Sequence, residues 1–209
     1  MSVIALFSGS YCRAGEVAQK LVGRLGYEPV EDSNLVEEAC SRFQADRTRL
    51  MRAMTSKASV FNKFTHEKER SLAAIKAALA EKLKADRLVV HGYAAHLIPK
   101  EISHALKICI IADMKHRTRV AMEVEGVTER DAQKRIHKED ESRVLWVEYL
   151  FGLKDPWAPQ LYDMVIPMHK TTVDGGVELI VENLGTDILR VSPASQAAVE
   201  DFLLATLVE

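Results

Sequence analysis

The chain has 209 residues, and its 28 Lys and Arg nearly balance its 30 Asp and Glu, so the net charge at pH 7 is −2. This length suits one α/β domain and is sufficient to bury a full hydrophobic core. The balanced charge argues against nucleic acid and anionic membranes as partners, because both are bound through clustered basic residues. Small metabolites remain open as ligands.

The three cysteines, Cys12, Cys40 and Cys109, are widely spaced and form no C-x-x-C pair. This pattern argues against a disulfide framework and against a zinc site, so we expect no metal ligands among them. No leading segment combines basic residues with a long apolar stretch, and no apolar run is long enough to cross a bilayer. The sequence therefore predicts a cytoplasmic protein.

The start of the chain has the pattern of a phosphate site. An apolar run at residues 3–7 is followed by a loop of mostly small residues at 8–15 and then by an amphipathic helix. In nucleotide-binding folds this order directs backbone N–H groups of the loop and of the helix N-terminus toward an anion. The residues expected to bind phosphate in this way are Ser8, Gly9, Ser10 and Gly15.

The loop nevertheless departs from the strict pattern G-x-x-x-x-G-K-[ST]. With Gly15 and its helix placed as in small nucleotide kinases, the lysine position falls on Ala14 and the hydroxyl position on Glu16. Arg13 is then the loop's only cation, and its guanidinium could replace the lysine. The alternative is an ordinary strand, turn and helix that bind nothing.

The helix after this loop is expected to end at Gly26, which stands where a C-cap glycine would. Residues 27–31 are expected to form a short strand, after which Ser33 can cap a helix that begins near Leu35. The next stretch has irregularly spaced apolar residues and is expected to hold helical pieces. Residues 65–84 have one apolar stripe and predict a clear helix.

Three further apolar runs, at residues 88–91, 106–112 and 162–167, predict strands that are covered on both faces. Helical patterns lie between them, and residues 173–189 predict a closing helix. Because strands alternate with helices of this length, we expect a doubly wound α/β fold with one parallel sheet.

A very polar helix is expected to start at Thr128, which begins a sequence similar to a capping box. Few of its residues up to Arg143 are apolar, so this segment should pack weakly and could close over a ligand. Within it, Asp140 and Arg143 are three residues apart and share one helix face, so the carboxylate could orient the guanidinium of Arg143.

The order of these features resembles the cytidylate kinase-like family of P-loop nucleotide kinases, and the likeness covers about residues 1–189. The resemblance rests on residues 15–21 and 25–27, Asp32, residues 91–95, residues 111–112 with Arg117, residues 140–143 and residues 152–166. It implies a three-layer αβα fold with a five-stranded parallel sheet and a helical lid.

The resemblance also implies an activity, which is phosphoryl transfer from ATP, with Mg²⁺, to a nucleoside monophosphate or a related small acceptor. On this chain the implied binding residues are the loop from Ser8 to Gly15, Asp32 for the acceptor, and Arg117. The implied catalytic residues are Arg13, Arg135, Asp140 and Arg143.

Two departures from the family pattern leave a second hypothesis open. The loop lacks its lysine, and Gly92-Tyr93-Ala94 stands where the family usually has Gly-Arg-Gly, so a phosphate-binding arginine is missing. Phosphoryl transfer depends on cations that stabilise the transferring group. The alternatives are therefore a non-catalytic module that senses a nucleotide or anion, and a scaffold that forms a homodimer.

The first unit is expected to span residues 1–190. Residues 191–209 predict a linker and a helix. This helix could begin a truncated C-terminal domain, with a weak likeness to BON domains, or it could dock on the same domain.

Overall fold

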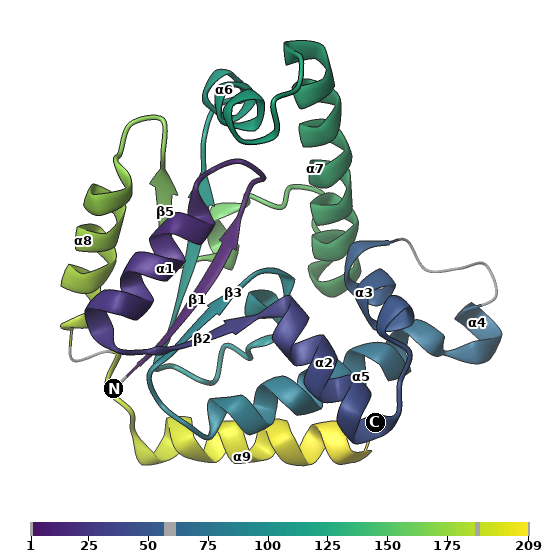
Figure 1. Ribbon diagram of the computed structural model, residues 1–209. Coiled ribbons are helices and arrows are strands. Elements are labelled where there is room, and N and C mark those ends of the chain that lie inside the picture. Colours follow the sequence, from purple (N-terminus) through teal and green to yellow (C-terminus); the bar gives the residue numbers. More distant parts are fainter. Residues whose placement is uncertain (1, 57–61, 187–188, 209) are drawn as a thin grey trace.

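A five-stranded, fully parallel sheet forms the centre of the molecule, in the order β2-β3-β1-β4-β5 (Figure 1). The structure is a computed structural model that describes residues 2–56, 62–186 and 189–208. The strands are β1 (Val3–Ser8), β2 (Glu28–Glu31), β3 (Leu88–His91), β4 (Ala105–Ile111) and β5 (Met164–Pro167). The expected α/β fold and its parallel neighbours are confirmed.

The central position of β1 follows from its uninterrupted apolar sequence. Val3, Ala5 and Phe7 face one hydrophobic core, whereas Ile4 and Leu6 face the other, and all five are at most 2% exposed. A strand that is buried on both faces needs apolar residues at every position, because successive side chains point to opposite faces. The loop after β1 is therefore held at the middle of the sheet's carboxyl edge.

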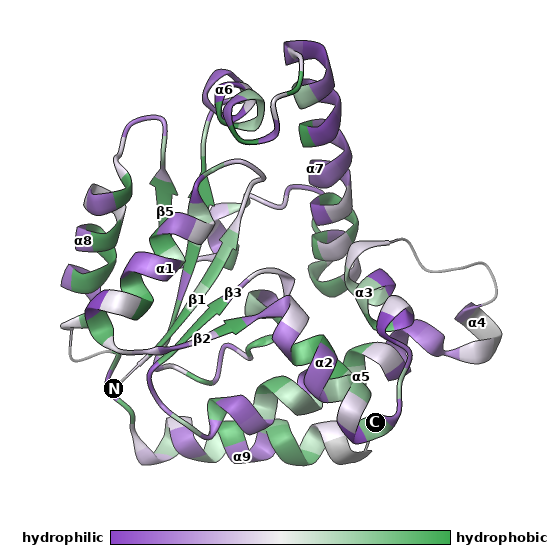
Figure 2. Ribbon diagram, in the orientation of Figure 1, coloured by the Kyte–Doolittle hydropathy of each residue, from purple (hydrophilic) through white to green (hydrophobic). Residues whose placement is uncertain are grey.

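Helices cover both faces of the sheet (Figures 1 and 2). On one face, α1 (Ala14–Leu25) and α8 (Val173–Leu184) enclose one core. The other core lies beneath several helices. These are α2 (Asp32–Phe43), α3 (Arg47–Thr55), α5 (Glu67–Leu83), the end of α7 (Glu129–Phe151) and α9 (Pro193–Val208). The remaining helices are α4 (Asn62–Thr65) and α6 (Met114–Glu125), with short 3₁₀ turns at Tyr93–Leu97 and Pro159–Leu161.

The helix ends agree with the sequence analysis in two of three places. Gly26 ends α1 with a φ of 66°, and the Thr128 side chain accepts a hydrogen bond from the Asp131 backbone N–H at the start of α7. The expected cap at Ser33 is wrong, because α2 begins earlier, at Asp32. Glu31 and Asn34 cap that start reciprocally, which satisfies two backbone donors.

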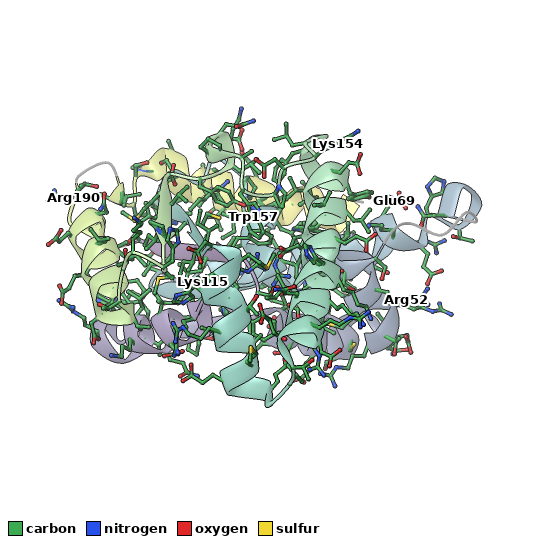
Figure 3. All side chains as sticks on the ribbon, turned by 90° about the horizontal axis from the view of Figure 1, so that it is seen from above. Arg52, Glu69, Lys115, Lys154, Trp157 and Arg190 are labelled. Atoms are coloured by element: carbon green, nitrogen blue, oxygen red, sulfur yellow. The ribbon has the colours of Figure 1, made fainter. Side chains whose placement is uncertain are left out.

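Helix α7 is a single 23-residue helix with two different environments. Its C-terminal part enters the main core, where Trp146 and Val147 are fully buried. Its N-terminal part packs on α6 and on Tyr11 of the loop after β1, through a small cluster that includes Ala132 and Ile136. We call α6, α7 and residues 126–128 between them the α6–α7 hairpin. Figure 3 shows its two helices side by side above the rest of the molecule.

The last helix, α9, contacts the preceding domain. Helix α9 packs along α5, and its Val199 is part of the main core (Figure 1). Within the described residues, we find no helix with the length and apolar character needed to cross a bilayer.

The two environments of α7 predict unequal effects of truncation. Trp146→Ala should lower the free energy of unfolding by about 3–5 kcal/mol, because it leaves a large cavity in the main core. Ile136→Ala should cost less globally, yet it should speed amide hydrogen exchange in residues 129–138, because the small cluster opens locally. Urea unfolding and hydrogen exchange measure the two effects. Equal global losses would contradict this division.

Candidate active site

The loop between β1 and α1 has the backbone of an anion-binding nest. Tyr11 and Arg13 both have a φ of 57°, which is uncommon for residues with a side chain. Among the described residues, no acceptor is found for the backbone N–H groups of residues 10–16. Alternation of right- and left-handed conformations turns successive N–H groups to one side, where they form a concave anion site. The strain of two such residues is typical of a functional loop.

Arg117 of α6 holds this loop through two hydrogen bonds. Its Nε donates to the Ser10 carbonyl oxygen at 2.8 Å, and its Nη2 donates to Ser10 Oγ at 2.7 Å. Gly9 is required here, because a Cβ at this position would lie 3.0 Å from Cys12 Sγ and 3.4 Å from Arg117 Cζ. Arg117 is 6% exposed, so it positions the loop and has little surface left for a ligand.

Asp140 of α7 binds the guanidinium of Arg117 and not that of Arg143, which the sequence analysis expected. The sequence analysis paired Asp140 with Arg143, whereas the carboxylate accepts two hydrogen bonds from Arg117, at 2.6 and 2.8 Å. Helix spacing placed the two residues on one face correctly, but Arg117 presents a planar pair of donors from the neighbouring helix. The bidentate pair joins α6, α7 and the loop.

Arg143 reaches the loop independently. Its Nε donates to the Ser8 carbonyl oxygen at 2.7 Å, and its Nη1 donates to the Glu139 carbonyl oxygen at 2.9 Å. Its Cζ also lies 5.8 Å from the centre of the Tyr93 ring. Arg143 thus stands at the middle of the site with part of its guanidinium facing the open space.

The other two candidate cations are paired with carboxylates. Arg13 contacts Glu16 at 2.8 Å and Glu123 at 3.0 Å. Arg135 pairs with Glu125, which also accepts a hydrogen bond from the Tyr11 hydroxyl. Carboxylates at the end of α6 therefore hold the two cations and the tip of the loop.

Asp32 lies at the other side of the site, just after β2. Its two oxygens accept hydrogen bonds from the backbone N–H groups of Tyr93 and Ala94, at 2.8 and 2.9 Å. Burial raises the pKa of this carboxyl to about 6, although the two N–H groups act in the opposite direction. Gly92 permits this close approach, since its φ is 125° and a Cβ there would lie 2.3 Å from an Asp32 oxygen.

A cavity of about 710 Å³ joins the loop to Asp32. Of the residues expected from the sequence, Ser8, Gly9, Ser10, Arg13, Gly15, Asp32 and Arg143 line it. Arg117, Arg135 and Asp140 do not, because they lie behind the loop or within the hairpin. Sequence reasoning missed the lining carboxylates Glu31, Glu125 and Glu139, which belong to no motif. Of these residues, only Glu31 could have been noticed from the sequence, because its three-residue spacing from Asn34 matches that of a capping box.

The remaining reactive side chains do not form a centre. Burial raises the pKa of Cys12 to about 11, so this thiol fills space in the loop and is not activated. His91 lines the cavity, whereas His96 is buried and contacts the Tyr162 hydroxyl. In the described part of the chain, no three His, Cys, Asp or Glu side chains group as metal ligands.

The approach of Gly92 to Asp32 gives a stability prediction with an internal control. Gly92→Ala should lower the free energy of unfolding by about 2–4 kcal/mol, because the methyl group collides with the Asp32 carboxylate and φ is unfavourable. Gly23→Ala in α1 should instead stabilise the protein by about 1 kcal/mol, since nothing lies near its Cβ position. Denaturant titration of both variants compares them directly. Equal changes of the unfolding free energy in the two variants would contradict a strained contact between residue 92 and Asp32.

The Arg117–Asp140 pair gives a second prediction. Asp140→Asn should cost about 3 kcal/mol of unfolding free energy, because it leaves a buried guanidinium without its counter-charge. Glu139→Gln removes an exposed carboxylate from the neighbouring position and should cost less than about 0.5 kcal/mol. Thermal unfolding of the two variants tests the difference. A loss of the same size in both would show that the pair does not hold the hairpin.

Comparison with known proteins agrees with this geometry. Residues 3–170 match the cytidylate kinase-like family. An uncharacterized protein from Eubacterium ventriosum ATCC 27560 shares the fold at 19% identity and a TM-score of 0.65, over 89% of this chain and 99% of that one. Shikimate kinase from Bacteroides thetaiotaomicron shares it at 11% identity and a TM-score of 0.52, over 88% and 99%. No curated protein matches the sequence. The match spans most of the chain, which therefore belongs to the cytidylate kinase-like family.

Proposed function

We propose that this protein binds the phosphate groups of a nucleotide in the loop after β1 and transfers a phosphoryl group to a small acceptor beside Asp32. The nest carries this proposal, because its N–H groups have no acceptor among the described residues and the loop lines the same cavity as Asp32. In the transfer, the acceptor hydroxyl oxygen bonds to the terminal phosphorus of ATP while the bond from that phosphorus to ADP breaks. The hydroxyl proton passes to Asp32 or to water.

The residues fit a phosphate chain better than they fit the usual magnesium site. Counted from Gly9, the lysine position of the strict pattern is Gly15 and not Ala14 as expected above, and the hydroxyl position is Glu16. Residues 10–16 supply N–H donors for phosphate oxygens. Glu16 offers an oxygen ligand that Mg²⁺ accepts, although Arg13 now holds that carboxylate.

Arg143 is the cation that can act on the transferring group. Its Nε anchors it to the Ser8 carbonyl oxygen, and the side chain lines the cavity between the loop and Asp32. A cation fixed at this position stabilises charge that develops during transfer, without the cost of reorganising. Membership of the family supports ATP as the cosubstrate, Mg²⁺ as its ion and a small molecule as the acceptor. A cytoplasmic location stays a prediction from the sequence.

A non-catalytic nucleotide or anion sensor is the second candidate. The observation that favours it is the pairing of Arg13 with Glu16 and Glu123, and of Arg135 with Glu125. Residue 15 is glycine where the strict pattern has lysine. Because Arg13 and Arg135 are paired with carboxylates, few cations near the loop remain for the transferring group. Binding without transfer would then be the function of the site.

Calorimetric titration with ATP, with and without Mg²⁺, tests the proposal. ATP should bind, and Gly15→Lys should tighten binding by about tenfold, because the position has open space and a lysine there can reach the phosphates. Gly23→Lys on the same helix adds the same charge outside the cavity lining and should leave the affinity within about twofold. No ATP binding by either form would reject the proposal.

Arg143→Ala separates transfer from sensing. It should lower the rate of phosphoryl transfer about a hundredfold and change ATP affinity much less, as expected for a contact made mainly in the transition state. Transfer assays with a panel of nucleoside monophosphates and small hydroxyl compounds measure the rate. ATP binding without transfer to any acceptor would favour the sensor.

A further inference from the structure

The acceptor end of the cavity is formed by residues that follow β2 and β3. They are Glu31, Asp32, Ser33, His91, Gly92 and Tyr93. This set has two carboxylates, two hydroxyls and one imidazole, and it contains no lysine or arginine. Burial also lowers the pKa of His91, so the imidazole is uncharged near neutral pH.

The whole cavity has an excess of negative side chains. Among its described lining residues, the cations are Arg13 and Arg143, and the carboxylates are Glu16, Glu31, Asp32, Glu125 and Glu139. Arg13 is already paired with Glu16 and Glu123, and Arg143 with Glu139. No ion pair involves Glu31 or Asp32 within the described ranges, so two carboxylates of the acceptor end are without a partner cation.

The arginines of α3, the nearest basic helix in sequence, do not change this balance. Arg47 pairs with Glu37 and Arg49 with Glu67, both at 3.6 Å. Arg52 does not line the cavity, and Figure 3 shows it across α7 from α6. Apart from Arg143, which we assign to the transferring group, and Arg13, which is paired with two carboxylates, the described lining has no cation for a phosphate on the acceptor.

An anionic acceptor would be repelled here. A phosphate or carboxylate placed here would lie close to two like charges, the exposed Glu31 and the half-buried Asp32, and the repulsion from Asp32 would exceed that in water. The N–H groups of Tyr93 and Ala94 are occupied by Asp32, so they are not available to an anion either. Hydroxyl groups and amines can instead donate to both carboxylates.

We infer that the acceptor is a hydroxyl compound without phosphate or carboxylate, either uncharged or with an amine, and not a nucleoside monophosphate. Glu31 and Asp32 select it by charge, and Ser33 and Tyr93 add hydrogen-bonding groups. This inference deepens the proposed function and rests on it for the direction of transfer. It concerns the opposite end of the cavity from the phosphate loop.

Equilibrium binding of matched pairs, measured without ATP, tests the inference. The pairs are cytidine with CMP, adenosine with AMP, and glucosamine with glucosamine 6-phosphate. At least one unphosphorylated compound should bind at least about tenfold more tightly than its phosphorylated partner at low salt. Tighter or equal binding of the phosphorylated partners overturns the inference, as does absence of binding by every unphosphorylated compound at millimolar concentration.

The variant Glu31→Gln tests whether the charge of Glu31 causes the discrimination against phosphorylated compounds. Glutamine keeps an oxygen that can cap α2 but removes the charge, so discrimination within a pair should fall about threefold. Glu200→Gln on the exposed side of α9 removes the same charge elsewhere and should leave discrimination unchanged. Unchanged discrimination in Glu31→Gln overturns the role of charge. A phosphorylated compound that bound through the loop would keep its affinity in Glu31→Gln, so a change of discrimination in this variant reports the acceptor end. Failure of the ATP titrations would reject only the proposed function.

Discussion

The buried guanidinium of Arg117 is the contact on which the candidate site depends. It joins the loop after β1, through both oxygens of Ser10, to Asp140 in the middle of α7. The loop has two residues in the left-handed conformation, and few hydrogen bonds form between its own backbone groups. Contacts from other elements therefore stabilise it. Arg117 supplies that support with a planar set of donors that a lysine could not replace.

The same contacts also restrict the motion of α7 in the α6–α7 hairpin. A very polar helix would be expected to move freely, yet α7 is fixed at its lower end by Trp146 and near its middle by Asp140 and Arg143. Only its first turns rest on a small apolar cluster with α6. Motion that admits a ligand is therefore expected at the hairpin tip, where few apolar contacts are lost on opening.

The two ends of the cavity present opposite chemistry to a ligand. The loop end has backbone N–H groups with no acceptor among the described residues, and such groups suit an anion. The Asp32 end has carboxylates, and Asp32 already accepts from the N–H groups of Tyr93 and Ala94.

The sequence by itself determined the parallel sheet, the order of its elements and the position of the loop, because apolar periodicity and glycines act through local geometry. It also identified the loop residues and Asp32, which lie at the two ends of the cavity. Only the tertiary structure decided which carboxylate each arginine meets. Asp140 holds Arg117 and not Arg143, and Glu125 holds Arg135. Long charged side chains select among all partners within reach in space, and spacing along the chain does not encode that choice.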